Sequence, residues 1–230
     1  MDTTTPAAID PPANVLLVHT GRAAPNGCEE LCYDDSDTAH LAVTFADEEP
    51  NCPDEGAIDG PLGQLTIGDM LPDAGDESEP DFTQPVVTDA VTDPADLSAI
   101  GVSISRFCKH WDDAGEEITV CFDGLDPLLR HTSPKAVFQF THVLANRLSS
   151  VDAYAHFHFD PTRHEDRVVS TFGTIFDAVV ADDTDESLSE ATDEDVAALL
   201  AEWDEEETVD TGSTGDTEAT DEDIARLLGN

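Results

Sequence analysis

Positively charged side chains are scarce in this sequence. Nine Lys and Arg residues stand against 52 Asp and Glu residues, which gives a formal net charge of −43. Nucleic-acid binding and attraction to anionic lipid surfaces both depend on Lys and Arg, so the composition argues against either partner. So large a charge would oppose folding by self-repulsion at ordinary ionic strength, whereas molar salt shortens the Debye length to roughly 3 Å. We therefore expect a protein of a halophilic archaeon.

Long apolar segments are also missing. No apolar run in the chain approaches the roughly 20 residues that span a bilayer. Residues 1–6 lack the basic and apolar regions of a signal peptide. We therefore expect a cytoplasmic protein that does not insert into membranes. Hydrophobic residues still make up 39% of the chain, in strand-like and helix-like runs, so we expect a folded protein and not a wholly disordered acidic chain.

The acidic residues are unevenly distributed along the chain. Residues 101–180 carry 11 acidic and 7 basic side chains, a net charge of −4, and the other 39 net negative charges lie outside this segment. The near-balanced segment is therefore the best candidate for a packed core. We predict a disordered N-terminus over residues 1–11, one domain over 12–181, and a disordered acidic tail over 182–230.

Hydrophobic periodicity predicts alternating strands and helices in the domain. The predicted strands cover residues 14–19, 41–45, 64–67, 86–87, 118–122, 153–159 and 176–180. The predicted helices cover residues 26–34, 93–111, 133–148 and 163–172, the second with Asp93 as N-cap and Pro94 at its first position. This alternation predicts an α/β fold of three layers, with a mostly parallel sheet and helices on both faces.

Five cysteines form an odd set without a Cys-x-x-Cys pair, which favours free thiols in a cytosolic protein. Cys28 and Cys32 are four residues apart, as two metal ligands on one helical turn could be, and Cys52 might supply a third ligand. No nearby His completes a zinc site, so we favour buried thiols.

His156 and His158 lie two residues apart on a predicted strand, so their side chains share one face. With His164 or Asp160 they could bind a metal. We favour strand histidines at the carboxyl edge of the sheet and expect no metal site, with His156 and His158 as the candidates if one exists.

The first predicted strand runs into a loop bracketed by Gly21 and Gly27, as a phosphate loop would be. However, Cys28 and Glu29 occupy the positions where such a loop has Lys and Ser or Thr, and a carboxylate there repels phosphate. Asp123 follows the apolar strand 118–122, as a magnesium-binding Walker B Asp would, although an Asp that caps a loop is the interpretation we favour. We therefore expect no catalytic residue and no cofactor.

Residues 118–129 and the helix at 138–144 resemble the Walker B region of RecA/KaiC-type ATPases. Residues 93–104 resemble small KaiC-like proteins of haloarchaea, some of them labelled transducer-like (HTR-like), and residues 157–161, His164 and 176–180 fit the same pattern. The resemblance covers residues 12–181 and implies a degenerate RecA/KaiC-like fold that lacks the Walker A motif.

The tail contains a duplicated peptide. Residues 190–200 recur as 218–228, with nine of eleven positions identical and a period of 28 residues. Each copy predicts a short helix, over 190–201 and 218–228, and in the first copy Thr192 and Asp195 approximate a capping box. The apolar stripes of the two helices are Val196, Leu199 and Leu200, and Ile224, Leu227 and Leu228.

These stripes suit docking into the groove of a protein partner, with two copies adding avidity. The alternative is that the helices fold back on the core of this chain. The peptide is also similar to a short acidic helix of bacterial flagellar switch proteins that binds a response regulator, which implies a signalling protein as partner.

Together these features predict a non-catalytic regulatory or signalling adaptor, linked to taxis or signal transduction, that docks partners through its C-terminal helices. The alternative function is an ATPase-like enzyme with an unorthodox phosphate loop that binds ATP, with Asp123 as the magnesium ligand.

Overall fold

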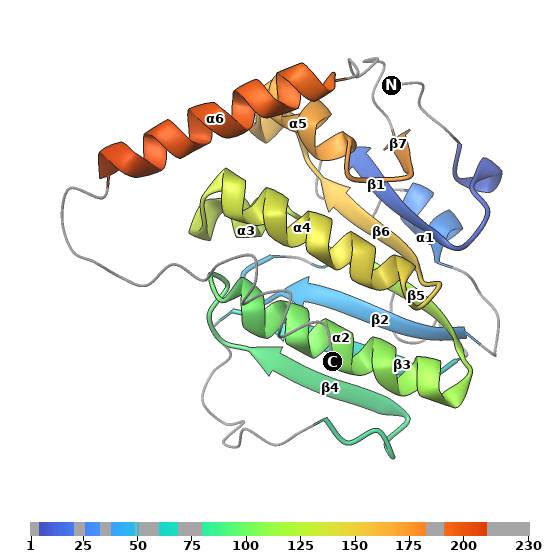
Figure 1. The fold of residues 1–230 in the computed structure, drawn as a ribbon. Coiled ribbons are helices and arrows are strands. Elements are labelled where there is room, and N and C mark those ends of the chain that lie inside the picture. The colour runs from blue at the N-terminus through green and yellow to red at the C-terminus, as the bar shows by residue number, and fades with distance from the viewer. Residues whose placement is uncertain are drawn as a thin grey trace.

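The structure is a computed structural model that describes residues 5–20, 26–32, 38–48, 50, 60–68, 80–182 and 191–210 (Figure 1). Its centre is a seven-stranded sheet of order β4-β3-β2-β5-β6-β1-β7, in which every neighbouring pair is parallel. The strands are β1 (Ala13–His19), β2 (Thr38–Phe45), β3 (Leu62–Ile67), β4 (Val86–Val91), β5 (Glu117–Phe122), β6 (Tyr154–Phe159) and β7 (Ala178–Asp182).

Helices connect the strands and cover the sheet. The α-helices are α1 (Asn26–Leu31), α2 (Leu97–Ala114), α3 (Asp126–His131), α4 (Pro134–Ser149), α5 (Asp166–Gly173) and α6 (Asp193–Asp210), and the 3-10 helices are η1 (Pro6–Ala8) and η3 (Pro161–Arg163). No helix in the described ranges combines the length and the apolar character that a membrane span requires.

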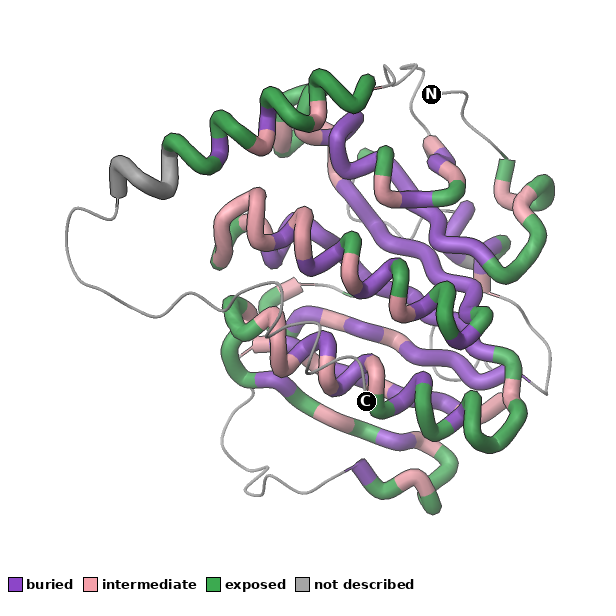
Figure 2. The backbone as a smooth tube through the Cα atoms, in the orientation of Figure 1, coloured by how far each residue is buried: buried purple, intermediate pink, exposed green. Residues whose placement is uncertain are grey.

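The sheet has helices on both faces, which confirms the predicted α/β fold. The larger core packs α2, α4, α5 and α6 against one face, and a smaller cluster packs α1 and the η1 region against the other. All seven residues of β1 and all six of β6 are buried, as expected of strands in the middle of a parallel sheet (Figure 2).

The start of α2 differs from the prediction. Asp93 is not the N-cap, because its carboxylate accepts a hydrogen bond from Ala95 N in a turn that precedes the helix. The N-cap is Asp96, whose side chain accepts from Ala99 N at 2.9 Å. Gly115 ends α2 in the left-handed region with φ 79°, where the missing Cβ avoids a steric cost.

The described part of the N-terminal segment 1–11, which the sequence predicts to be disordered, contains a short helix. Pro6–Ala8 form η1, and Ile9 packs against the smaller cluster. Pro6 sits at the first position of this short helix, which its fixed φ favours.

The first tail peptide forms α6, which starts as predicted and runs further than predicted. Thr192 N donates to Asp195 Oδ2 at 2.9 Å, and Asp195 N donates to Thr192 Oγ1 at 3.3 Å, so the capping box is confirmed. Figure 1 shows α6 lying across α4 and α5.

The helix α6 folds back on the core of its own chain. Leu199 and Trp203 are buried in the larger core, and Trp203 lies 6.4 Å from the Phe138 ring between centroids. Ion pairs of Lys135 with Asp204 and of Arg167 with Glu202 flank this contact.

In this arrangement Leu199 is not available to a partner, because the chain's own core buries it. The expectation that the stripe of Val196, Leu199 and Leu200 docks a partner is therefore corrected for the first copy: Leu199 is buried and Leu200 packs partly against the core. The second copy, with Ile224, Leu227 and Leu228, lies outside the described residues.

We expect Trp203→Ala to lower the free energy of unfolding by about 2–4 kcal/mol, because it removes a large buried side chain. Urea unfolding in molar KCl measures this change. The control is Ala198→Gln, which alters an exposed position of the same helix. An equal stability of both variants would contradict the docking of α6.

Candidate metal centre

Four metal-ligating side chains meet on the α1 face of the sheet. Cys121 on β5 is directly opposite His156 on β6 in the parallel register, so both side chains emerge side by side. His158 follows two residues later on β6 and therefore points to the same face. Helix α1 covers this face and adds Cys28. One ligand atom from each of the four residues lies within 4.8 Å of all the others.

The contacts within this group are short. Cys28 Sγ lies 3.9 Å from Cys121 Sγ and 3.3 Å from His156 Nε2. Cys121 Sγ lies 3.6 Å from His158 Nε2. These three distances connect all four residues through the atoms that would bind a metal.

The spacing matches the edges of a tetrahedron around zinc. Zinc bonds of about 2.3 Å to sulfur and about 2.0 Å to nitrogen place two sulfurs about 3.8 Å apart, and a sulfur and a nitrogen about 3.5 Å apart. The observed sulfur–sulfur distance of 3.9 Å and sulfur–nitrogen distances of 3.3 and 3.6 Å lie within about 0.2 Å of these values. Three of the six distances between ligand atoms thus agree with tetrahedral coordination, and the other three are at most 4.8 Å.

The donor set and its burial narrow the type of metal. Cys28 and His156 have no exposed surface, His158 is 1% exposed and Cys121 is 4% exposed. Two thiolates and two imidazoles suit zinc and other soft or borderline metals, whereas magnesium and calcium require oxygen ligands. Two thiolates would also neutralise a divalent ion in this dry environment.

A further histidine, His19, contacts the ring nitrogen of His158 that does not face Cys121. His19, at the carboxyl end of β1, places its Nε2 3.0 Å from His158 Nδ1, and the two rings are perpendicular. If His158 binds metal through Nε2, its Nδ1 carries the proton and donates to His19. Such a contact behind a metal-binding imidazole fixes its tautomer and ring orientation.

His156 has only one satisfied nitrogen among the described residues. Its Nε2 contacts Cys28, while its Nδ1 is buried without a hydrogen-bond partner there. A buried polar atom left without a partner costs roughly 1–3 kcal/mol. Metal coordination at Nε2 would offset that cost.

Cys32 brings a third thiol to the rim of the group. Hydrogen bonds from Cys121 and Cys28 hold the pKa of the Cys32 thiol far below its ordinary value, and the charge of His156 acts in the same direction. By contrast, burial raises the pKa of Cys108 to about 12, so this thiol on α2 stays protonated. The surroundings of Cys32 therefore favour the thiolate, whereas those of Cys108 favour the thiol.

The sequence presents the cysteines and the histidines of this group as separate candidates and does not predict that they lie together. Cys28, His156 and His158 are members, whereas the expected third ligands are elsewhere: His164 Nε2 and Asp160 N both bind the Asp126 carboxylate, at 2.7 and 3.0 Å. Cys52 lies outside the described residues. Cys121 was missed because it sits within an apolar strand. The only signal for it was a thiol one residue before the end of the strand, at Phe122.

Asp123 lies at the carboxyl end of β5, as its Walker B resemblance implies. It is 5% exposed, and its backbone N donates to Val43 O at 2.9 Å. In the strand order, β2 is followed by β3 toward one edge of the sheet, and its neighbour β5 is followed by β6 toward the other edge. Ligand sites of parallel α/β folds are commonly found at the carboxyl ends of two such strands.

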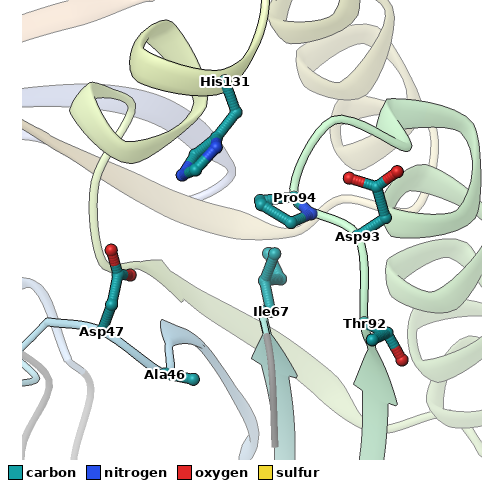
Figure 3. Close-up of a pocket in the computed structure, with 8 residues that line it drawn as sticks. Ala46, Asp47, Ile67, Thr92, Asp93, Pro94 and His131 are labelled. Atoms are coloured by element: carbon teal, nitrogen blue, oxygen red, sulfur yellow. The ribbon is translucent and has the colours of Figure 1, made fainter.

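A cavity of about 350 Å³ lies near this point, at the ends of β2, β3 and β4. Figure 3 shows Asp47 and His131 facing the same hollow, with Ile67 at the end of β3. Two carboxylates, of Asp47 and Asp93, line it, and none of the described lining residues is Lys or Arg. This lining disfavours a nucleotide phosphate.

Comparison with known proteins identifies a family without assigning a function. The family model for DUF7504, described as a family of unknown function, matches residues 12–182. No curated protein matches, and no solved structure matches. The resemblance to KaiC-like proteins is not tested by these comparisons and stays a prediction.

In the metal-free chain we expect the free energy of unfolding to fall as the pH drops below about 6.5. Burial, and then the charges of His156 and His19, lower the pKa of His158 well below 6.5. The unfolded chain therefore takes up a proton that the folded chain does not, which costs up to about 1.4 kcal/mol per pH unit. Urea unfolding between pH 7.5 and 5 measures the slope.

His158→Gln should reduce this slope, whereas His142→Gln, at an exposed position on α4, should preserve it. Identical slopes in the wild type and His158→Gln would show that His158 does not titrate as inferred.

Proposed function

Since the chain belongs to DUF7504, a family of unknown function, we propose its role from its own geometry: a zinc-binding regulatory or signalling adaptor without catalytic activity. The observation that carries the zinc site is the tetrahedral spacing of the buried atoms of Cys28, Cys121, His156 and His158. The adaptor role is supported by the lack of phosphate-binding residues and by the repeated tail peptide.

The proposed zinc site is structural. Catalytic zinc keeps one coordination position open for water or substrate, whereas structural zinc has four protein ligands. Here four protein ligands are at hand and each is at least 95% buried, which leaves no room for a substrate. The ion would connect α1 to β5 and β6, three elements that are distant in the sequence.

The proposed ion offers a reason why the described residues form only a small apolar cluster on this face. The cluster on this face contains eight buried hydrophobic residues, two of them the ligands Cys28 and Cys121, and α1 is only six residues long. A helix this short is not stable by itself. Because metal binding and folding are coupled when ligands come from separate elements, zinc would supply the free energy that holds α1 in place.

The adaptor part of the proposal rests on two further observations. Cys28 and Glu29 replace the cation and hydroxyl of a phosphate loop, and the cavity at the ends of β2, β3 and β4 is lined by two carboxylates and, among the described residues, by no Lys or Arg. Neither feature supports the alternative of an ATPase with Asp123 as magnesium ligand. Since α6 is docked on its own core, the second tail peptide at 218–228 is the remaining candidate for partner binding.

We expect the full chain, depleted of metal by a chelator in molar KCl, to bind one zinc ion. Cobalt should bind in its place and give the intense visible bands of tetrahedral coordination together with sulfur-to-metal charge transfer. Cys121→Ser and His156→Ala each remove a ligand, so we expect their affinity to fall by at least about 100-fold. Isothermal titration and cobalt spectra measure both properties.

The matched control is Cys108→Ser, which removes a buried thiol outside the group and should keep full binding. His19→Ala should weaken binding by about 10- to 100-fold, as loss of an orienting contact does. Unchanged affinity in Cys121→Ser, or cobalt spectra of octahedral type, would refute the proposed site.

Partner binding should depend on the second tail peptide. We expect a chain truncated after residue 210, which keeps α6, to lose the partners that the full chain retains in molar KCl. Leu227→Asp with Leu228→Asp should have the same effect, because it places charge on the apolar stripe. Quantitative cross-linking mass spectrometry compares the variants, and equal recovery of partners would contradict the docking role.

A further inference from the structure

Cys32 is more exposed than the two thiols of the group, Cys28 and Cys121. It follows α1, and its backbone N donates to Cys28 O at 3.0 Å, so it continues the helical turn that carries Cys28. It is half-buried, whereas Cys28 and Cys121 are buried. Of these three cysteines, Cys32 is therefore the one that an oxidant in solvent reaches most readily.

The Cys32 side chain also lies beside potential disulfide partners. It packs against the smaller cluster, which contains Cys28 and Cys121. All three are free thiols in the structure. An accessible thiol beside a second, protected thiol is the arrangement found at redox-sensitive cysteines.

We propose that Cys32 is an oxidation site for hydroperoxides, and that its oxidised form is resolved by Cys121 into a disulfide that expels the metal. The loss of metal rests on the proposed zinc site. The oxidation and the disulfide rest on Cys32 and Cys121 alone.

The reaction has two steps. The Cys32 sulfur attacks one oxygen of the hydroperoxide, so an S–O bond forms and the O–O bond breaks, which yields a sulfenic acid and, with a proton from solvent, water or an alcohol. The Cys121 sulfur then attacks the Cys32 sulfur, so the S–S bond forms and the S–O bond breaks. The departing hydroxide takes up a proton as water. The two sulfurs lose two electrons in total, and the peroxide oxygens gain them.

Geometry favours Cys121 over Cys28 as the resolving thiol. Residues four apart on a helix have Cβ atoms about 5–6 Å apart, whereas a disulfide needs about 3.5–4.5 Å. A Cys28–Cys32 bond would therefore require α1 to unwind. Cys121 comes from a strand that faces α1, so this restriction does not apply to it.

The disulfide would convert a closed metal site into an incomplete one. Cys121 would no longer offer a thiolate, which leaves Cys28, His156 and His158 as ligands. Because metal affinity depends on deprotonated thiols, the ion would dissociate. A thiol reductant would restore both the thiol and the site, so the change is reversible.

The experiment treats the zinc-loaded full chain with hydrogen peroxide in molar KCl. Released zinc is followed with a colorimetric chelator, and disulfides are located by peptide mapping. We expect zinc release together with a Cys32–Cys121 disulfide, both reversed by dithiothreitol and zinc. Cys32→Ser should bind zinc normally. Its rate of zinc release should be lower than that of the wild type by at least about tenfold, because the remaining thiols are buried. Cys108→Ser should behave as the wild type.

Several results would overturn the proposal. Release from Cys32→Ser at the wild-type rate, or a disulfide that lacks Cys32, would exclude Cys32 as the oxidation site. A Cys28–Cys32 disulfide would exclude Cys121 as the resolving thiol. Loss of zinc binding in Cys32→Ser would make Cys32 a ligand instead. A chain that binds no zinc but forms the Cys32–Cys121 disulfide would refute the zinc site and retain the oxidation site.

Discussion

The in-register parallel pairing of β5 with β6 is the constraint on which the rest of this structure depends. It places Cys121 directly beside His156, and the two-residue period of β6 then adds His158 on the same face. A slip of one residue would turn either strand's donors to the opposite face, among the phenylalanines of the larger core. The positions of the proposed metal ligands and the core packing are therefore fixed by the same hydrogen bonds.

The two faces of the sheet are stabilised by different means. On the larger-core face, aromatic residues of α2, α4 and α5 bury a wide apolar surface, and the Trp203 side chain of α6 extends it. On the other face, the described contacts involve a six-residue helix and a small cluster. Coordination bonds are short and strong, so four ligands can replace many apolar contacts there. Zinc binding would thus stabilise the α1 face in the way that apolar burial stabilises the larger core.

The sequence predicted the elements better than it predicted the site. Strand and helix types follow from periodicity, and the caps of α4 at Ser133 and of α6 at Thr192 follow from side-chain chemistry that acts within three residues. The proposed ligands do not follow from nearby residues in this way. Cys28 and His158 are 130 residues apart and come together only through strand order and register. Neither property is encoded locally. Cys121 in particular has the sequence environment of an ordinary apolar strand residue.

The many carboxylates of the chain affect how a metal site can select one ion over others. With 52 acidic residues, exposed carboxylates offer weak oxygen sites for hard cations over much of the sequence. If the chain works in molar salt, as its composition predicts, the Debye length would be roughly 3 Å and the net charge would not attract an ion over a distance. Selectivity for a metal would then come from contacts shorter than that length, at a site from which salt is excluded. Buried thiolates and imidazoles meet both conditions, and the half-buried Cys32 is the point where solvent chemistry can still reach them.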